Sequence, residues 1–178
     1  MPPVQSPTEF RTQVTFRALM QALAMPGQVQ HLPPNPNALA QISETLVDLE
    51  TTFFTPDPTL HLSLLGTGAL PESASQANYL FFPQVDEAAL DLIAQASRGD
   101  MLYPDRAATL ILATDFAGLV RGWTGPGIQG KRAVSLGLPE GFWTLRSEAV
   151  VYPLGWDVFL VSGTQVLGLP RSTNVELM

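Results

Sequence analysis

The chain contains no cysteine, and this absence removes several kinds of chemistry at once. It can form no disulfide framework, no thiolate zinc site, no iron–sulfur cluster and no cysteine nucleophile. Basic residues are also scarce, because 9 Lys and Arg stand against 16 Asp and Glu, for a formal charge of −7. Sequence-independent binding of DNA or RNA depends on many Lys and Arg contacts to phosphates, so no nucleic-acid partner is expected.

Long hydrophobic runs are missing as well. The longest apolar stretches, such as 107–113, fall far short of the ~18 residues that suggest a membrane span. The first residues lack the basic and apolar regions of a secretory signal, so we expect a cytoplasmic protein with no membrane partner. Charged residues make up only 14% of the chain, and a surface so poor in charge is often partly covered by another subunit.

Three helices are expected in the 178 residues, which we assign to one domain, 1–178. The first opens with Ser6 as N-cap, Pro7 and Glu9, and it stops at 26–27. The second begins at Asn37, and the third spans 86–97 before a basic residue and a glycine. Helical spacing predicts the buried stripes of the first two: Phe16, Leu19, Met20 and Leu23, then Leu39, Ile42, Leu46 and Leu49.

Short runs that are apolar or alternate with polar residues predict the strands. They lie at 61–65, 79–82, 109–113, 118–123, 133–136, 158–162 and 166–169. The last two meet at Gly163 and Thr164, which favours a tight hairpin. Helices interleaved with strands predict an α/β or α+β domain with one mixed sheet flanked by helices.

The segment 125–132, Gly-Pro-Gly-Ile-Gln-Gly-Lys-Arg, is the strongest local signal for ligand binding. It fits both GxxxxGK and GxGxxG, patterns in which a strand, the loop and a following helix hold phosphates on backbone N–H groups. Here the following residues favour strand or turn, and Arg132 stands in place of the magnesium-binding Ser or Thr. A turn between two strands is the favoured interpretation. The alternative, an anion-binding nest formed around Gly125, Gly127 and Lys131, is also compatible with the sequence.

Other chemistry-bearing patterns are weak. His31 and His61 belong to no HxH or HExxH motif, so no metal site is expected. The sequence has no GxSxG elbow, and we assign no catalytic residue.

Two small groups of charged residues remain as candidates for a ligand or an interface. Asp48 and Glu50 sit where the second helix is expected to end. Acidic residues there interact unfavourably with the helix dipole, so we expect a partner for them, either Arg17 or a group outside the fold. Arg171 and Ser172 lie in the closing segment among small hydroxyl and amide groups. That cluster could hold an anion or close an interface.

Six segments, in order, resemble one known family: 16–27, 46–51, 108–112, 122–128, 152–160 and 169–176. The fourth contains Thr-Gly-Pro-Gly-Ile, and the last reads Leu-Pro-Arg-Ser-Thr-Asn-Val-Glu. Their order and spacing are similar to the H subunit of the carbon–phosphorus lyase system of bacterial phosphonate breakdown, the PhnH family. Ser172 and Asn174 depart from a closing segment that in the family often has threonine and histidine.

The resemblance implies an α/β fold distantly like the pyridoxal-phosphate-dependent transferases, with no cofactor expected. It implies a subunit that works with the G, I and J proteins, forms a homodimer when isolated and lacks a complete active site alone. Such a subunit assists the replacement of the adenine of ATP by a phosphonate, which gives ribose 1-phosphonate 5-triphosphate.

Two other functions remain open at this point. One is a stand-alone nucleotide- or anion-binding protein that uses the 125–131 loop. The other is a degenerate pyridoxal-phosphate protein that binds a small ligand at Lys131, the only lysine.

Overall fold

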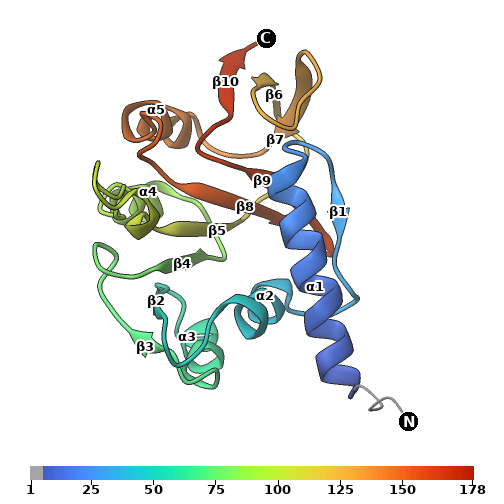
Figure 1. Cartoon of the computed structure of the whole chain (residues 1–178), viewed down its shortest axis with the longest axis vertical. Coiled ribbons are helices and arrows are strands. Elements are labelled where there is room, and N and C mark those ends of the chain that lie inside the picture. The colour runs from blue at the N-terminus through green and yellow to red at the C-terminus, as the bar shows by residue number, and fades with distance from the viewer. Residues whose placement is uncertain (1–5) are drawn as a thin grey trace.

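A seven-stranded mixed sheet runs through the middle of the protein (Figure 1). The computed structural model describes residues 6–178. The strands of this sheet are β1 (Gln30–His31), β2 (Thr52–Phe54), β3 (Leu70–Pro71), β4 (Tyr79–Phe82), β5 (Thr109–Ala113), β8 (Asp157–Ser162) and β9 (Gln165–Leu169). Their order is β1-β9-β8-β5-β4-β2-β3. The strands from β3 to β8 pair in parallel, whereas β9 is antiparallel to both of its neighbours.

A second, three-stranded antiparallel sheet corrects the expectation of a single sheet. It consists of β10 (Asn174–Leu177), β6 (Leu119–Thr124) and β7 (Arg132–Leu136), in that order. The central strand β6 pairs with the end of the chain, where Val175 lies opposite Trp123. Local periodicity could not show this sheet, because β10 is short and its partner lies about 50 residues away in the chain.

Helices cover both faces of the central sheet. They are α1 (Pro7–Ala24), α2 (Ala38–Leu46), α3 (Pro58–Leu65), α4 (Glu87–Ile93) and α5 (Glu140–Ala149), with a 3-10 turn at Pro104–Arg106. Buried residues of α1, α2 and α3 share one core, and those of α4 and α5 share the other with the small sheet. The expected α/β class is therefore confirmed. Among residues 6–178, none of the helices combines the length and apolarity needed to cross a membrane.

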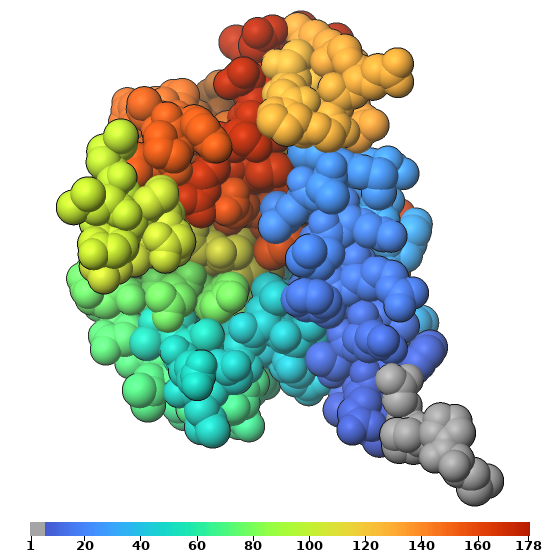
Figure 2. Space-filling view, in the orientation of Figure 1, coloured from blue at the N-terminus to red at the C-terminus, as the bar shows by residue number. Residues whose placement is uncertain are grey.

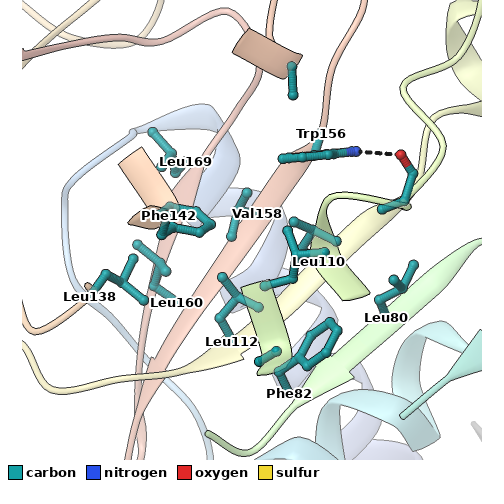
Figure 3. Packing of buried hydrophobic residues seen from close by; sticks show 14 of the residues in the cluster. Leu80, Phe82, Leu110, Leu112, Leu138, Phe142, Trp156, Val158, Leu160 and Leu169 are labelled. Carbon is teal, nitrogen blue, oxygen red and sulfur yellow. Dashed lines mark hydrogen bonds between the residues drawn. The ribbon is translucent and has the colours of Figure 1, made fainter. Parts of the chain in front are cut away.

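Alternation along the strands divides the side chains between these two cores, because successive residues point to opposite faces of a sheet. In β4, Leu80 and Phe82 join the core beneath α4 and α5, whereas Phe81 joins the core beneath α1, α2 and α3. Figure 3 shows the core beneath α4 and α5, where Phe142 of α5 lies among leucines of the sheet such as Leu160.

The capping box that predicts the start of α1 is confirmed. The Glu9 N–H donates to Ser6 Oγ at 3.2 Å, and the Ser6 N–H donates to Glu9 Oε2 at 2.7 Å. The hydrogen bond from the Ser6 backbone N–H, followed by one from the Ser6 side chain, holds the pKa of Glu9 below its ordinary value. The end of α1 before 26–27 is also as expected.

The predicted buried stripe of α1 is wrong at two positions. Phe16 and Met20 are 49% and 56% exposed, and the buried residues are instead Thr15, Ala18, Leu19 and Ala22. Small residues are needed on this face because α1 approaches β9 closely. A Cβ on Gly168 would collide with the Ala22 carbonyl group.

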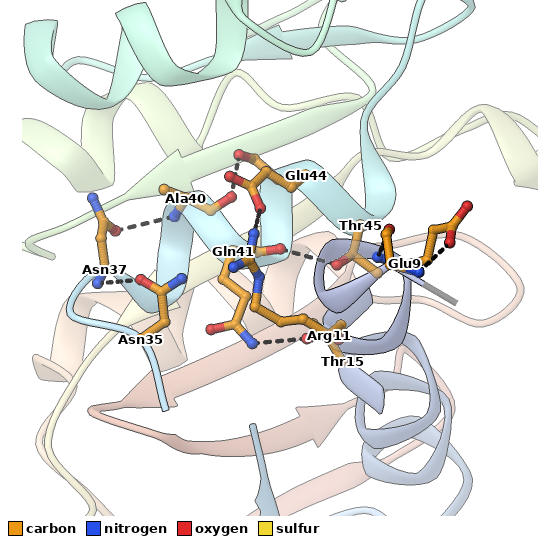
Figure 4. A network of polar contacts seen from close by, with 11 residues as sticks. Glu9, Arg11, Thr15, Asn35, Asn37, Ala40, Gln41, Glu44 and Thr45 are labelled. Atoms are coloured by element: carbon orange, nitrogen blue, oxygen red, sulfur yellow. Dashed lines mark hydrogen bonds and ion pairs between the residues drawn. The ribbon is translucent and has the colours of Figure 1, made fainter. Parts of the chain in front are cut away.

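The second helix starts as predicted, with Asn37 Oδ1 accepting from the Ala40 N–H at 3.0 Å. It ends at Leu46 rather than reaching Leu49, which is exposed. Polar contacts join it to α1, as Figure 4 shows. Buried Gln41 donates through Nε2 to Thr15 Oγ1 at 2.8 Å, and Arg11 forms an ion pair with Glu44 at 2.9 Å.

The strand predicted at 61–65 is wrong, because these residues belong to α3. Asp57 is the N-cap and Pro58 occupies the first turn, so the helix begins before the apolar run. The third predicted helix is correctly started by Asp86 but ends at Ile93, before a turn. The structure also contains α5, β2 and β10, which the periodicity did not indicate.

The other predicted strands are confirmed within about one residue of their bounds. The hairpin also holds, because Ser162 of β8 lies opposite Gln165 of β9.

Candidate functional site

A cleft of about 450 Å³ lies between α5 and the closing segment of the chain. One side comes from α5, and the other from β10 and the loop before it; both stand at the top of Figure 1. Arginines from three different elements line it: Arg121 of β6, Arg146 of α5 and Arg171 of the loop after β9. The cleft therefore gathers positive charge from a chain whose net charge is −7.

Arg171 is engaged in contacts within the fold. Its backbone N–H donates to Asp157 Oδ1 at 2.8 Å, and its Nη2 donates to Asp157 Oδ2 at 2.8 Å. The Nη1 group donates to the carbonyl oxygens of Pro104 at 2.7 Å and Pro153 at 3.4 Å. One guanidinium thus ties the loop after β9 to the start of β8 and to two further loops.

Arg121 is also paired, although it is buried. Its Nη2 lies 2.5 Å from Glu140 Oε2, and its guanidinium carbon lies 4.6 Å from the centroid of the Trp143 ring. The Arg121 side chain is 5% exposed and that of Glu140 is 61% exposed, so the pair has one buried and one solvated end. The Nε of Arg121 is buried without a hydrogen-bond partner.

Arg146 differs from the other two arginines because no carboxylate lies within ion-pair distance of it in the described part of the chain. Its Nη2 donates to the carbonyl oxygens of Pro170 at 3.0 Å and Thr173 at 2.9 Å. Burial lowers the pKa of Arg146 to about 10, and the charge of Asp157 opposes that shift. Arg146 is therefore a cation at neutral pH, held without a directly bonded counter-ion.

Thr173 completes the set of unpartnered groups. The residue is 1% exposed, and its Oγ1 is buried without a hydrogen-bond partner, as is the Nε of Arg146. Because nearly all buried polar groups in native proteins are hydrogen-bonded, each exception needs an explanation. Among residues 6–178, only six buried side-chain atoms are unpartnered, and three of them belong to cleft-lining residues.

Two of the residues predicted from the sequence line this cleft, Arg171 and Ser172. Gly125 lies behind it: with φ +136°, a Cβ there would meet the Ser172 carbonyl oxygen at 2.8 Å. Lys131 instead pairs with Glu176 at 2.8 Å, and this exposed contact lowers the pKa of Glu176.

The 125–131 loop joins β6 and β7, which are antiparallel neighbours, in agreement with the favoured interpretation of a turn. Gly127 belongs to this turn and packs against α1, where a Cβ would meet the Ala24 carbonyl oxygen. No helix follows the glycines, so the geometry of a phosphate-binding P-loop is not formed.

Arg17 and Glu50 lie elsewhere. Arg17 is exposed on α1, and Glu50 is in the turn after α2, where its N–H donates to Asp48 Oδ1 at 3.0 Å. Neither lines the cleft, and no ion pair joins Arg17 to Asp48 or Glu50.

A second depression of about 410 Å³ lies at the carboxyl ends of β4, β5 and β8. This edge of a parallel sheet commonly carries ligands. Its polar lining includes Gln84, Thr114, Asp115 and Ser162, but no basic residue and no buried unpartnered side-chain atom. Residues 6–178 also contain no cluster of His, Cys, Asp and Glu suited to a metal ion. The arginine-lined cleft is therefore the stronger candidate.

Sequence reasoning missed Arg121 and Arg146, and it included Thr173 only among the small polar neighbours of Arg171. One signal was available for Arg146, because Phe142, Arg146 and Ala149 recur at helical spacing and place an arginine on the buried face of α5. No comparable local signal points to Arg121, which lies opposite Leu177 where β6 pairs with β10.

The fold and the cleft together define a single α/β domain in which the two buried arginines of residues 6–178, Arg121 and Arg146, line one cleft. The sequence model described as bacterial phosphonate metabolism protein (PhnH) matches residues 5–176. The chain belongs to this family, which confirms the resemblance found in the sequence.

Two relatives are similar over almost the whole chain. C-P lyase subunit HtxG of Stutzerimonas stutzeri is 34% identical over 173 residues, covering 94% of this chain and 87% of the relative. The alpha-D-ribose 1-methylphosphonate 5-triphosphate synthase subunit PhnH of Rhizobium meliloti is 31% identical over 185 residues, covering 94% of this chain and 91% of the relative.

Proposed function

We propose that this chain is a subunit of the carbon–phosphorus lyase core complex. In that role it works in one complex with the G, I and J subunits. With the G and L proteins it assists the I protein in replacing the adenine of ATP by a phosphonate, which gives ribose 1-phosphonate 5-triphosphate. The observation that carries the proposal is the similarity over 94% of the chain to a relative named as a subunit of the corresponding synthase. The second relative is likewise named as a subunit.

The surface supports a protein that functions in an assembly. Exposed apolar side chains gather on two loops, which we call the loop patch: Met101, Leu102, Tyr103, Val151 and Tyr152. The loops are neighbours, because the Gly155 N–H donates to the Arg98 carbonyl oxygen and Arg171 bonds to a carbonyl of each loop. In Figure 2 the segment near residue 100 projects as a yellow-green lobe at the left edge.

A contiguous apolar patch on a charge-poor surface is typical of a surface that another protein covers. Leu102 is 83% exposed and lies at the centre of the three consecutive apolar residues. We assign the loop patch to contact with the other subunits of the complex. When isolated, the chain is expected to form a homodimer.

Co-expression of the full chain with its G, I and J partners tests the proposal. We expect one co-purifying assembly that releases adenine from ATP when a phosphonate and the L protein are added, and no release from this chain alone. Leu102→Glu should weaken co-purification, because it places a charge in an apolar contact. Leu62→Glu is the matched control, since Leu62 is 70% exposed but lies on α3, outside the loop patch.

Adenine release by the purified chain alone would overturn the assignment as a subunit. Failure of the wild-type chain to co-purify with any partner would do the same. Equal co-purification of the Leu102→Glu and Leu62→Glu variants would refute the loop patch as the contact surface.

A further inference from the structure

We infer that the cleft between α5 and β10 is a binding site for a phosphoryl or phosphonyl oxyanion, held by Arg146, Arg121 and Thr173. The site itself rests on the geometry of the cleft. The choice of a phosphorus oxyanion among anions also rests on the proposed function.

Charge is the first argument. Three arginines line the cleft, and Glu140 and Asp157 pair with two of them, Arg121 and Arg171. Arg146 has no carboxylate partner in residues 6–178, although this residue is only 5% exposed. A buried cation without a directly bonded counter-ion is costly, and an anion in the adjoining cleft would supply that counter-ion.

Unpartnered hydrogen-bonding groups are the second argument. The Nε of Arg146, the Nε of Arg121 and the Oγ1 of Thr173 are all buried without a partner, and all three residues line the same cleft. They come from α5, β6 and the loop before β10, three separate elements that line the cleft. A tetrahedral oxyanion presents several oxygen atoms in different directions, so it suits donors carried by three elements better than a planar carboxylate does.

Space and access agree with this assignment. A volume of about 450 Å³ lies within the usual range for small-molecule sites of ~300–1,000 Å³. Glu140, the partner of Arg121, has a side chain that is 61% exposed. It can move into solvent when an anion approaches, which would free the Arg121 guanidinium to turn toward the ligand.

Isothermal titration calorimetry on the full chain, in chloride buffer at fixed ionic strength, tests the inference. The three titrants are inorganic phosphate, methylphosphonate and acetate. We expect saturable binding of phosphate, of methylphosphonate or of both, and none of acetate at the same concentrations. Comparison of the first two titrants distinguishes a phosphoryl from a phosphonyl source.

Thr173→Val is the sharpest variant, because valine has nearly the shape of threonine and the native hydroxyl has no partner to lose. Without titrant its thermal stability should equal or exceed that of the wild type. Its affinity for the anion should fall about fivefold, the effect of one hydrogen bond. Arg146→Lys keeps the charge but loses the fork of donors, and binding should weaken about tenfold.

Thr55→Val is the matched control, since Thr55 is buried and does not line the cleft. It should leave the affinity unchanged. Three results would overturn the inference: no saturable binding of phosphate or methylphosphonate, equal binding of acetate, or unchanged affinity in Thr173→Val. None of these bears on co-purification with partners, so a failure here is distinct from a failure of the proposed function.

Discussion

Replacing Arg171 by methionine tests whether this arginine holds the loops around the cleft together. The substitution removes the ion pair with Asp157 and the hydrogen bonds to the carbonyl oxygens of Pro104 and Pro153. The side chains of Arg171 and Asp157 are 16% and 27% exposed, so solvent screens their attraction only in part. The lost contacts then cost about 3 kcal/mol of unfolding free energy, below the full penalty for a deeply buried pair.

For a chain of 178 residues, that loss corresponds to a decrease in Tm of roughly 6–12 °C. Thermal unfolding followed by circular dichroism measures it. Lys131→Met is the matched control, because it breaks only the exposed pair with Glu176, which solvent screens, and it should lower the Tm much less. Equal shifts in the two variants would refute the structural role of Arg171. If Arg171→Met gives the larger shift, a double-mutant cycle with Asp157→Asn measures the interaction energy of the Arg171–Asp157 pair.

Three further predictions concern single positions. Gly125→Ala should lower the Tm more than Gly130→Ala, because both have positive φ but only the Cβ at Gly125 would meet backbone, the Ser172 carbonyl oxygen at 2.8 Å. In Tyr79, burial and then Asp48 raise the pKa of the phenol. Ultraviolet titration should therefore show one late tyrosine that Tyr79→Phe removes. Because the unfolded phenol ionises first, the wild type should lose stability as the pH rises above about 10, and Tyr79→Phe less so. Ser6→Ala removes the N-cap of α1 and should cost about 1 kcal/mol in urea unfolding. The same change at an exposed serine inside a helix, Ser63 of α3, should cause no loss of stability.

Signals confined to a few neighbouring residues predicted structure well in this chain. The Ser6 and Glu9 capping box and the Asn37 cap are examples, because their hydrogen bonds need only local geometry. The run 61–65 misled for the opposite reason, since a short apolar run fits a buried strand or a buried helix equally. The local pair Asp57 and Pro58 would have distinguished the two.

The cleft depends on contacts between distant parts of the chain, and only part of it could be predicted. Arg171 and Ser172 were selected because their neighbours are small and polar, and they do line it. Arg121 is buried because β6 lies between β7 and β10, and Arg146 because α5 packs on the central sheet. The residues adjacent to Arg121 do not indicate its burial, whereas the helical spacing of Phe142, Arg146 and Ala149 is the one local signal for that of Arg146.

The difference between Arg171 and Arg146 decides which substitutions inform on the cleft. Arg171 donates to Asp157 and to the carbonyl groups of two loops, so its removal would loosen the segment 170–173 that carries Thr173. Weaker anion binding in Arg171→Met would therefore say nothing about direct contact. Thr173→Val leaves every hydrogen bond of the structure in place, because the hydroxyl makes none, while the backbone carbonyl still accepts from Arg146. A loss of affinity there, with stability retained, can come only from the site itself.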